Sequence, residues 1–500
     1  MTRSSHQKTT PNTRHQSIVL GVSNMIVSLV MFLSPVILTR VLGKSDFADF
    51  RLLWLLANTA QLLAPLGLPN SLMYFLPRVD AEERAHFVTQ TVLVLIITGS
   101  VAAYLASPYN PFLPEKFHFE GLIVPVFIVV WVVSKMLELL PTADLRVDYQ
   151  AFSLISTSAF RLIVIVGVAF LTNDIHAVFK AVLALGLFKL ILLIFYIFKW
   201  HGIRVTGLKL KRVTEQLGYA LPFGLTAIVN NLRRQLEQWI VAFMFVPEAF
   251  AVFSIGAMEL PILALVRQTL GHVIFPRMSK AHAKGDYGRI LYLNQSANLA
   301  TAFLVFPISA FILIFAEPLV TLLFSEEYAG TAIIFQVYLG VTIFRVIDVA
   351  NIMMIFSQKL FVAKVSLSLL FLSVLLSYFG AKTFGMAGAA LGSLSAQAIY
   401  TVATYIRACK LLNVGFGALQ EWKGFAHAAS GSLCAVGAAW LATQIVDAES
   451  WLLARLVVAG LFTFSIYLVY LKIFGYDWVI AAFLNREKWG DKFKREEISE

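Results

Sequence analysis

The chain has little charge and almost no cysteine. Only 14% of its 500 residues are Asp, Glu, Lys or Arg, whereas a soluble domain carries about a quarter. This scarcity of charge excludes a soluble enzyme. Cys409 and Cys434 are the only cysteines in the sequence, too few for a disulfide framework. The composition therefore requires a different solvent, and a lipid bilayer is the one that fits.

Motifs of catalysis, metal binding and nucleotide hydrolysis are absent from the sequence. It contains no nucleophile elbow, no His-Glu-x-x-His and no EF-hand pattern. Gly43-Lys44-Ser45 resembles the end of a phosphate-binding loop, but Leu38 stands where the first glycine should be. The nine histidines are scattered singly rather than at metal-ligand spacing. We therefore expect no enzyme activity, no metal and no cofactor.

Hydrophobic residues dominate what is present. They make up 59% of the chain, with a mean hydropathy of +0.77. A spanning helix needs about 20 apolar residues, and the apolar runs bounded by charge or by Pro and Gly predict fourteen such helices. They are expected at residues 17–39, 52–76, 87–105, 122–140, 151–171, 177–198, 217–246, 250–274, 290–315, 331–357, 365–379, 386–406, 424–446 and 451–474. The predicted fold class is an all-α polytopic membrane protein with about 14 transmembrane helices.

The distribution of basic residues predicts the orientation. With a cytoplasmic N-terminus, 25 of the 40 Lys and Arg residues fall in inside segments and five in outside loops. This asymmetry predicts a multi-pass protein of the inner or plasma membrane with both termini in the cytoplasm. It also accounts for the net charge of +11 without a nucleic-acid partner. The outside loops are short, so we expect no extracytoplasmic catalytic domain.

An internal repeat with a period near 200 residues divides the chain. Phe47-Ala48-Asp49-Phe50 opens the second predicted helix, and Phe250-Ala251-Val252-Phe253 opens the eighth. Both helices close at a Pro-Arg step, at residues 77–78 and 276–277. The copies lie six helices apart, which predicts two six-helix lobes related by a parallel repeat, plus two C-terminal helices. The expected organisation is a polar N-terminus at 1–16, an N-lobe at 17–200, a basic linker at 201–216, a C-lobe at 217–406, two helices at 407–474 and an interfacial, charged tail at 475–500.

Short motifs along residues 17 to 475 resemble one family of transporters. They are Arg40-Val41-Leu42-Gly43 before Phe47, Leu66-Gly67-Leu68-Pro69, Leu221-Pro222-Phe223-Gly224, Phe275-Pro276-Arg277, Glu317-Pro318-Leu319-Val320 and Gly385-Met386-Ala387-Gly388. Together they resemble the oligosaccharide flippase branch of the multidrug/oligosaccharidyl-lipid/polysaccharide exporter superfamily. In such flippases an Asp is expected near the middle of the seventh helix, where this chain has Glu237.

Charges within the predicted spans mark the candidate site. An ionised side chain at the bilayer centre costs about 2.5 to 3.5 kcal/mol on insertion scales, so those that persist line a wet cavity, pair or reach the headgroups. The candidate substrate-binding cations are Arg161, Lys189, Arg233, Arg234 and Arg267, and the candidate charge-balancing or coupling acids are Glu237 and Glu259. Arg345 and Asp348 are expected to form a structural i,i+3 pair. Lys135 is expected to reach the headgroups or to pair with Glu138.

The surplus of deep cations and the resemblance together predict a flippase. It would move a lipid-linked oligosaccharide of the polyprenyl diphosphate type from the cytoplasmic to the outer leaflet for surface polysaccharide assembly. Membrane lipids and a polysaccharide polymerase are the expected partners. One alternative is a drug/cation antiporter of the same superfamily, for which a net acidic cavity is expected. The other is a membrane glycan polymerase or ligase, which would need a large outside loop.

Overall fold

The computed structural model describes residues 13–119, 121–204, 210–445 and 452–476, apart from the side chains of some helical residues. Within these ranges the chain is helical and contains no strand. It forms two units, Met1–Ala251 and Val252–Glu500. The predicted all-α class is confirmed.

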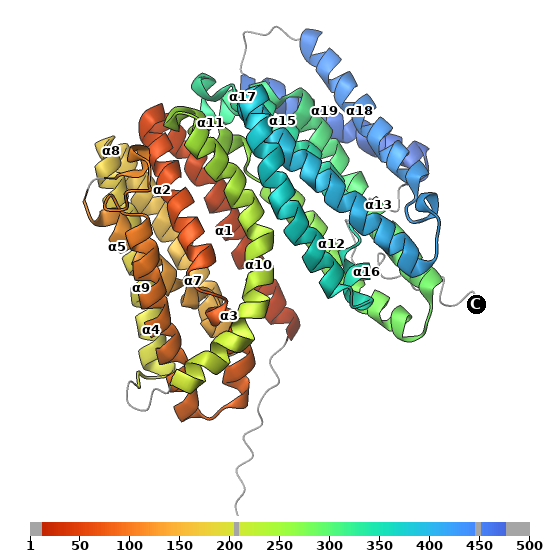
Figure 1. Cartoon of the computed structure of the whole chain (residues 1–500). Coiled ribbons are helices and arrows are strands. Elements are labelled where there is room, and N and C mark those ends of the chain that lie inside the picture. The colour runs from red at the N-terminus through yellow and green to blue at the C-terminus, as the bar shows by residue number, and fades with distance from the viewer. Residues whose placement is uncertain (1–12, 120, 205–209, 446–451, 477–500) are drawn as a thin grey trace, which may run out of the picture. The chain divides into compact units, whose positions relative to one another are not determined.

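The first unit contains the helices up to the unit boundary (Figure 1). They are α1 (Thr13–Val41), α2 (Lys44–Leu63), α3 (Leu68–Phe75), η1 (Leu76–Arg78), α4 (Ala81–Leu105), η2 (Glu115–Phe117), α5 (Ile123–Val133), η3 (Ser134–Glu138), α6 (Leu140–Ala143), α7 (Val147–Phe160), η4 (Arg161–Val166), α8 (Gly167–Thr172), α9 (Ile175–Trp200) and α10 (Leu210–Met244). The boundary falls inside α11 (Pro247–Gly256).

The second unit contains the helices that follow α11, including two short 3-10 helices. They are α12 (Pro261–Ala283), α13 (Tyr287–Ile314), α14 (Ala316–Phe324), η5 (Glu326–Tyr328), α15 (Thr331–Val346), α16 (Ala350–Ile355), α17 (Lys359–Leu412), η6 (Phe416–Ala418), α18 (Trp422–Ile445) and α19 (Leu452–Ile473). Residues 477–500, on which the predicted interfacial tail falls, lie outside the described part of the chain, as does most of the polar N-terminus.

Every one of the fourteen predicted spans coincides with helix, although several are interrupted. Among the described residues, nine helices are individually long and apolar enough to cross a membrane, and joining α2 to α3 makes ten. One of the nine, α17, covers two predicted spans, because Phe384 and Gly385 leave the helical conformation in its middle. The predicted spans at 250–274 and 331–357 are each broken into two helices, α11 with α12 and α15 with α16. A count of long apolar helices is therefore lower than the number of predicted spans, because some spans are divided between shorter helices and one helix covers two spans.

A glycine explains the break between α2 and α3, which are bent by 40°. Gly67 has a φ of +77°, a conformation that favours glycine. A Cβ atom at this position would lie 2.8 Å from the Ala220 carbonyl oxygen and 2.9 Å from the Cα of Gly224. The Leu-Gly-Leu-Pro motif thus allows α3 to begin directly against α10.

The two Phe-Ala-x-Phe copies occupy similar environments. Phe47 and Phe50 are fully buried near the start of α2, and Phe250 and Phe253 are fully buried in α11. In each copy the helix is interrupted before its Pro-Arg step, at residues 64–67 in the first and 257–260 in the second. The repeat is therefore one of structure as well as sequence.

Close helix packing characterises the second unit. Its α13 packs against α12, α15 and α18, around a core that includes Leu299 and Phe303. Within α17 the chain folds back at Gly385, whose φ is +65°. A Cβ atom on Gly388 would overlap the backbone of Gly380, and one on Gly392 would overlap the backbone at Ser377. Gly388 and Gly392, spaced as GxxxG, thus let the two halves of α17 approach closely.

Candidate functional site

A cavity of about 810 Å³ whose walls carry polar and charged side chains lies within the first unit. Its walls come from α1, α2, α3, the segment from α5 to η4, α9 and α10. Uncharged polar side chains are spread around it: Asn24, Asn58, Gln61, Asn70, Thr142, Gln150, Thr157, Ser158, Asn231 and Gln235. The charged groups among the described wall residues are Lys135, Glu138, Arg161 and Lys189. Three cations and one carboxylate give these walls a net charge of +2.

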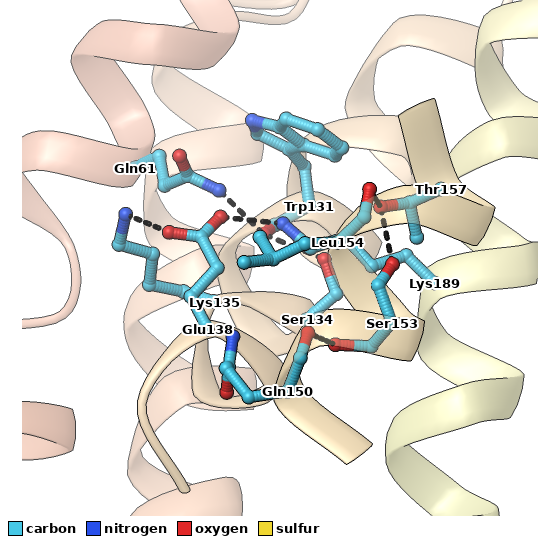
Figure 2. Close-up of polar contacts among 10 residues, drawn as sticks. All are labelled: Gln61, Trp131, Ser134, Lys135, Glu138, Gln150, Ser153, Leu154, Thr157 and Lys189. Carbon is cyan, nitrogen blue, oxygen red and sulfur yellow. Dashed lines mark hydrogen bonds and ion pairs between the residues drawn. The ribbon is translucent and has the colours of Figure 1, made fainter. Parts of the chain in front are cut away.

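Glu138 bridges two lysines in the cavity wall. Its Oε2 accepts a hydrogen bond from Lys135 Nζ at 2.5 Å, and its Oε1 accepts one from Lys189 Nζ at 2.6 Å. Figure 2 shows the carboxylate between the two ammonium groups. Lys135 and Glu138 share the 3-10 helix η3, in which residues i and i+3 eclipse each other. Lys189 comes from α9, so the bridge also ties two helices together.

Two indole rings contact two of the wall cations. Lys189 Nζ lies 4.3 Å from the ring centroid of Trp131, and the Arg161 guanidinium lies 4.3 Å from that of Trp54. The two indoles pack edge to face with centroids 5.2 Å apart. A cation over an indole face is attracted by the ring quadrupole. The aromatic pair therefore fixes a lysine and an arginine along the same wall.

Arg161 lies at an irregularity of the helical backbone. It begins η4, one turn and a half of π-helix between α7 and α8. Isolated π-helical turns inside α-helices are frequent at functional sites. The Nε of Arg161 is buried and has no hydrogen-bond partner among the described residues. The guanidinium thus retains donor capacity beside the cavity.

Further wall residues have unused hydrogen-bonding capacity. Buried atoms without a partner in the described part of the chain include Trp54 Nε1, Trp131 Nε1, Gln150 Oε1 and Gln235 Oε1, and all four residues line the cavity. Buried polar groups are normally satisfied. Their concentration here indicates a site that receives a polar occupant.

The predicted cluster on α10 lies beside this cavity. Asn231 and Gln235 line it, and Arg234 Nη2 donates to Asn231 Oδ1 at 2.8 Å. Arg233 neighbours Arg234 on the same helix, and Glu237 is buried with 1% of its surface exposed. Of the five predicted substrate-binding cations, the structure thus brings two to the wall, Arg161 and Lys189, and connects a third through an asparagine.

The remaining predicted charges lie in the second unit. Glu259 falls in the break between α11 and α12 rather than on a continuous helix, because residues 257–260 are not helical. Its Oε1 accepts a hydrogen bond from Arg345 Nη1 at 3.3 Å. Asp348 Oδ1 accepts from the backbone N–H of Ala350 at the start of α16, at 2.8 Å. Arg267 belongs to α12, but its side chain lies outside the described residues.

Sequence reasoning did not assign Lys135 and Glu138 to the site. Their predicted i,i+3 pair is present, but its position in the cavity wall and its link to Lys189 were not foreseen. The available signal was a third repeated element. A cation and an acid three residues apart recur as Arg345 and Asp348, 210 residues later and at the break of the corresponding helix of the second half.

The fold is that of a polytopic helical membrane protein with a cavity in its first unit. The chain belongs to the polysaccharide biosynthesis protein family, whose model matches residues 14–282. No curated protein sequence matches it.

Solved transporters share the fold. The lipid II flippase MurJ in an inward closed conformation has a TM-score of 0.70 at 14% identity, covering 91% of this chain and 99% of that one. An inward-facing multidrug resistance MATE family transporter of the MOP superfamily has a TM-score of 0.59 at 14% identity, covering 80% and 98%. A mutant of the Vibrio cholerae MATE transporter VcmN has a TM-score of 0.52 at 15% identity, covering 81% and 97%. The resemblance noted in the sequence is confirmed.

Proposed function

We propose that this protein flips a lipid-linked oligosaccharide of the polyprenyl diphosphate type from the cytoplasmic to the outer leaflet, for cell-surface polysaccharide assembly. The observation that carries the proposal is the +2 charge of the cavity walls in the first unit. The chain's membership of the polysaccharide biosynthesis protein family supports the choice of a glycan substrate. The fold shared with a lipid II flippase supports transport of a lipid-linked one.

The wall chemistry suits a diphosphate linked to sugar. Guanidinium and ammonium groups bind phosphate oxygens by charge-assisted hydrogen bonds, and Arg161, Lys135 and Lys189 supply them. The surrounding Asn, Gln, Ser and Thr side chains can exchange hydrogen bonds with sugar hydroxyls. A volume of about 810 Å³ falls within the range of about 300 to 1,000 Å³ typical of small-molecule sites. The cavity would hold the headgroup while the polyprenyl tail stays in the bilayer.

A drug/cation antiporter is the second candidate, because a multidrug resistance MATE family transporter shares the fold. A cavity for cationic drugs is expected to carry net negative charge. The four charged wall residues of this cavity instead sum to +2. The flippase is therefore the better supported function.

The experiment compares a deletion strain with strains complemented by the wild type or by Arg161→Gln. We expect the deletion to retain lipid-linked oligosaccharide on the cytoplasmic leaflet and to lack its surface polymer. The wild type should restore export of the oligosaccharide and the surface polymer, and the Arg161→Gln variant should restore neither. Normal surface glycan in the deletion strain would contradict the proposal, and so would loss of drug resistance with normal glycan.

The proposed orientation places both termini in the cytoplasm of a cell (inner or plasma) membrane. A reporter inserted after Arg212 should then report the cytoplasm, and one at Asp174 the outside. Finding both on one side would overturn the fourteen-span topology. A polysaccharide polymerase that receives the flipped substrate is the proposed functional partner.

A further inference from the structure

We propose that Glu138 sets the charge of the cavity so that it matches a diphosphate diester, a group with two negative charges, in preference to a phosphate diester with one. This inference rests on the proposed function and specifies the anionic part of its substrate. The carrying observation is the Lys135–Glu138–Lys189 bridge in the wall that also holds Arg161.

Glu138 lowers the net positive charge of the wall but leaves both lysines with free N–H donors. An ammonium group has three N–H donors, and each lysine gives one to a Glu138 oxygen. The others remain for a ligand. Because both oxygens belong to one carboxylate, the bridge holds the two ammonium groups beside each other in the cavity wall, where one diphosphate can contact both. Glu138 is therefore a resident anion that positions two cations and does not have to leave when substrate binds.

The charge count then distinguishes the two kinds of lipid-linked sugar. Lys135, Lys189, Arg161 and Glu138 together carry +2. A diphosphate diester makes the loaded wall neutral, whereas a phosphate diester leaves one positive charge. Uncompensated charge is unfavourable in a low-dielectric membrane interior, so the neutral complex should be transported fastest. Without Glu138 the wall would carry +3, and the diphosphate complex would stay charged.

Four proteins test this count. They are the wild type, Lys135→Met, Glu138→Gln and the double variant that combines both changes. Their wall charges are +2, +1, +3 and again +2. Each full-length protein is purified in detergent, and its folding is checked by thermal melting. The probes are farnesyl diphospho-N-acetylglucosamine and farnesyl phospho-N-acetylglucosamine, which differ by one phosphate.

Affinity for the diphosphate probe should follow wall charge. The wild type should prefer it over the phosphate probe by about tenfold or more, equivalent to about 1.4 kcal/mol. Lys135→Met should bind it about tenfold more weakly. Glu138→Gln should bind it several-fold more tightly and transport more slowly, because a charged complex is left behind. The double variant should return to the wild-type affinity and preference.

The double variant decides the outcome. If it binds as weakly as Lys135→Met, the lysine itself matters rather than the count, and the inference is overturned. Equal affinity of the wild type for both probes would also overturn it, while leaving the proposed function standing if complementation succeeds. If the wild type binds neither probe and fails to complement, the proposed function falls together with this inference.

Discussion

The two halves of the molecule carry the same cation-x-x-acid spacing at the break of corresponding helices, but the two pairs have different surroundings. In the first unit, Glu138 bridges Lys135 and Lys189 in the wall of a cavity. In the second, Arg345 contacts Glu259, and the acid, Asp348, accepts a hydrogen bond from the backbone N–H of Ala350. The spacing of the pair is the same in both units, but the third residue that contacts it is a cation, Lys189, in the first unit and an acid, Glu259, in the second.

The contrast shows that a buried charge acquires its role from its tertiary partner. A second cation on a shared carboxylate leaves positive charge in excess, which can attract an anion. In the second unit the third residue is an acid, so Arg345, Asp348 and Glu259 sum to −1 and leave no positive charge in excess. The first unit is therefore the expected place of substrate recognition, and the charges of the second are expected to support its structure.

The largest expected effect tests whether the second unit depends on packing. Gly392→Val would place side-chain atoms inside the backbone at Ser377, and overpacking of this kind typically costs about 1 to 3 kcal/mol, occasionally more. We expect nearly complete loss of folded protein, measured by fluorescence-detected size exclusion.

Gly437→Ala is the matched control for that variant. Gly437 also lies in a helix, α18, but a Cβ atom there meets nothing within 4 Å. Its protein level should equal that of the wild type. Normal folding of Gly392→Val would show that the close approach within α17 is not needed.

The next effect concerns recognition in the first unit. Arg161→Gln removes a cavity cation that lies over Trp54 but takes part in no ion pair among those seen in the described residues. Transport per folded protein should fall at least tenfold, about 1.4 kcal/mol, at nearly unchanged protein level. Arg161→Lys should recover part of it, because lysine keeps the charge and loses the planar fork. Loss of folded protein with normal specific transport would assign Arg161 to structure.

Much of the fold could be predicted because the bilayer restricts what apolar runs can do. A run of about 20 apolar residues tends to be helical in lipid, and each of the fourteen runs is mostly helical in the described residues. The helix breaks were less accessible. The Gly67 break depends on the backbone of α10, about 150 residues away, and a hydropathy pattern contains no information about that contact.

The candidate site was predictable only in part, for a related reason. Arg161 and Lys189 stood out because they lie deep in apolar runs. Lys135 and Glu138 were close to a predicted helix end, where snorkelling is the simpler explanation. Their importance depends on Lys189 of α9, 51 residues further along the chain. The depth of a charged residue in the membrane can be estimated from the sequence of its own helix, but its partner on a neighbouring helix cannot.

A moderate effect is expected from the ion pair of the second unit. Arg345→Gln and Glu259→Gln should each lower the amount of folded protein two- to fivefold and leave transport per folded protein within about twofold. The side chains are 18% and 31% exposed, so solvent screens the pair and a coupling of about 1 kcal/mol or less is expected from the double-mutant cycle. A tenfold loss of transport at normal abundance would move recognition into this unit and break the comparison.

The smallest effect should come from α10, at the margin of the cavity. Arg234 is exposed and donates to Asn231, which lines the wall, so it is connected to the site through that amide. Arg234→Gln and Asn231→Ala should each lower transport about two- to threefold without changing protein level. The double variant should be no worse than either single change, because both remove one interaction. If Arg234→Gln instead reduces transport as far as Arg161→Gln, the arginine contacts the substrate directly. The set of cations that recognises the substrate would then extend beyond the three wall cations onto α10.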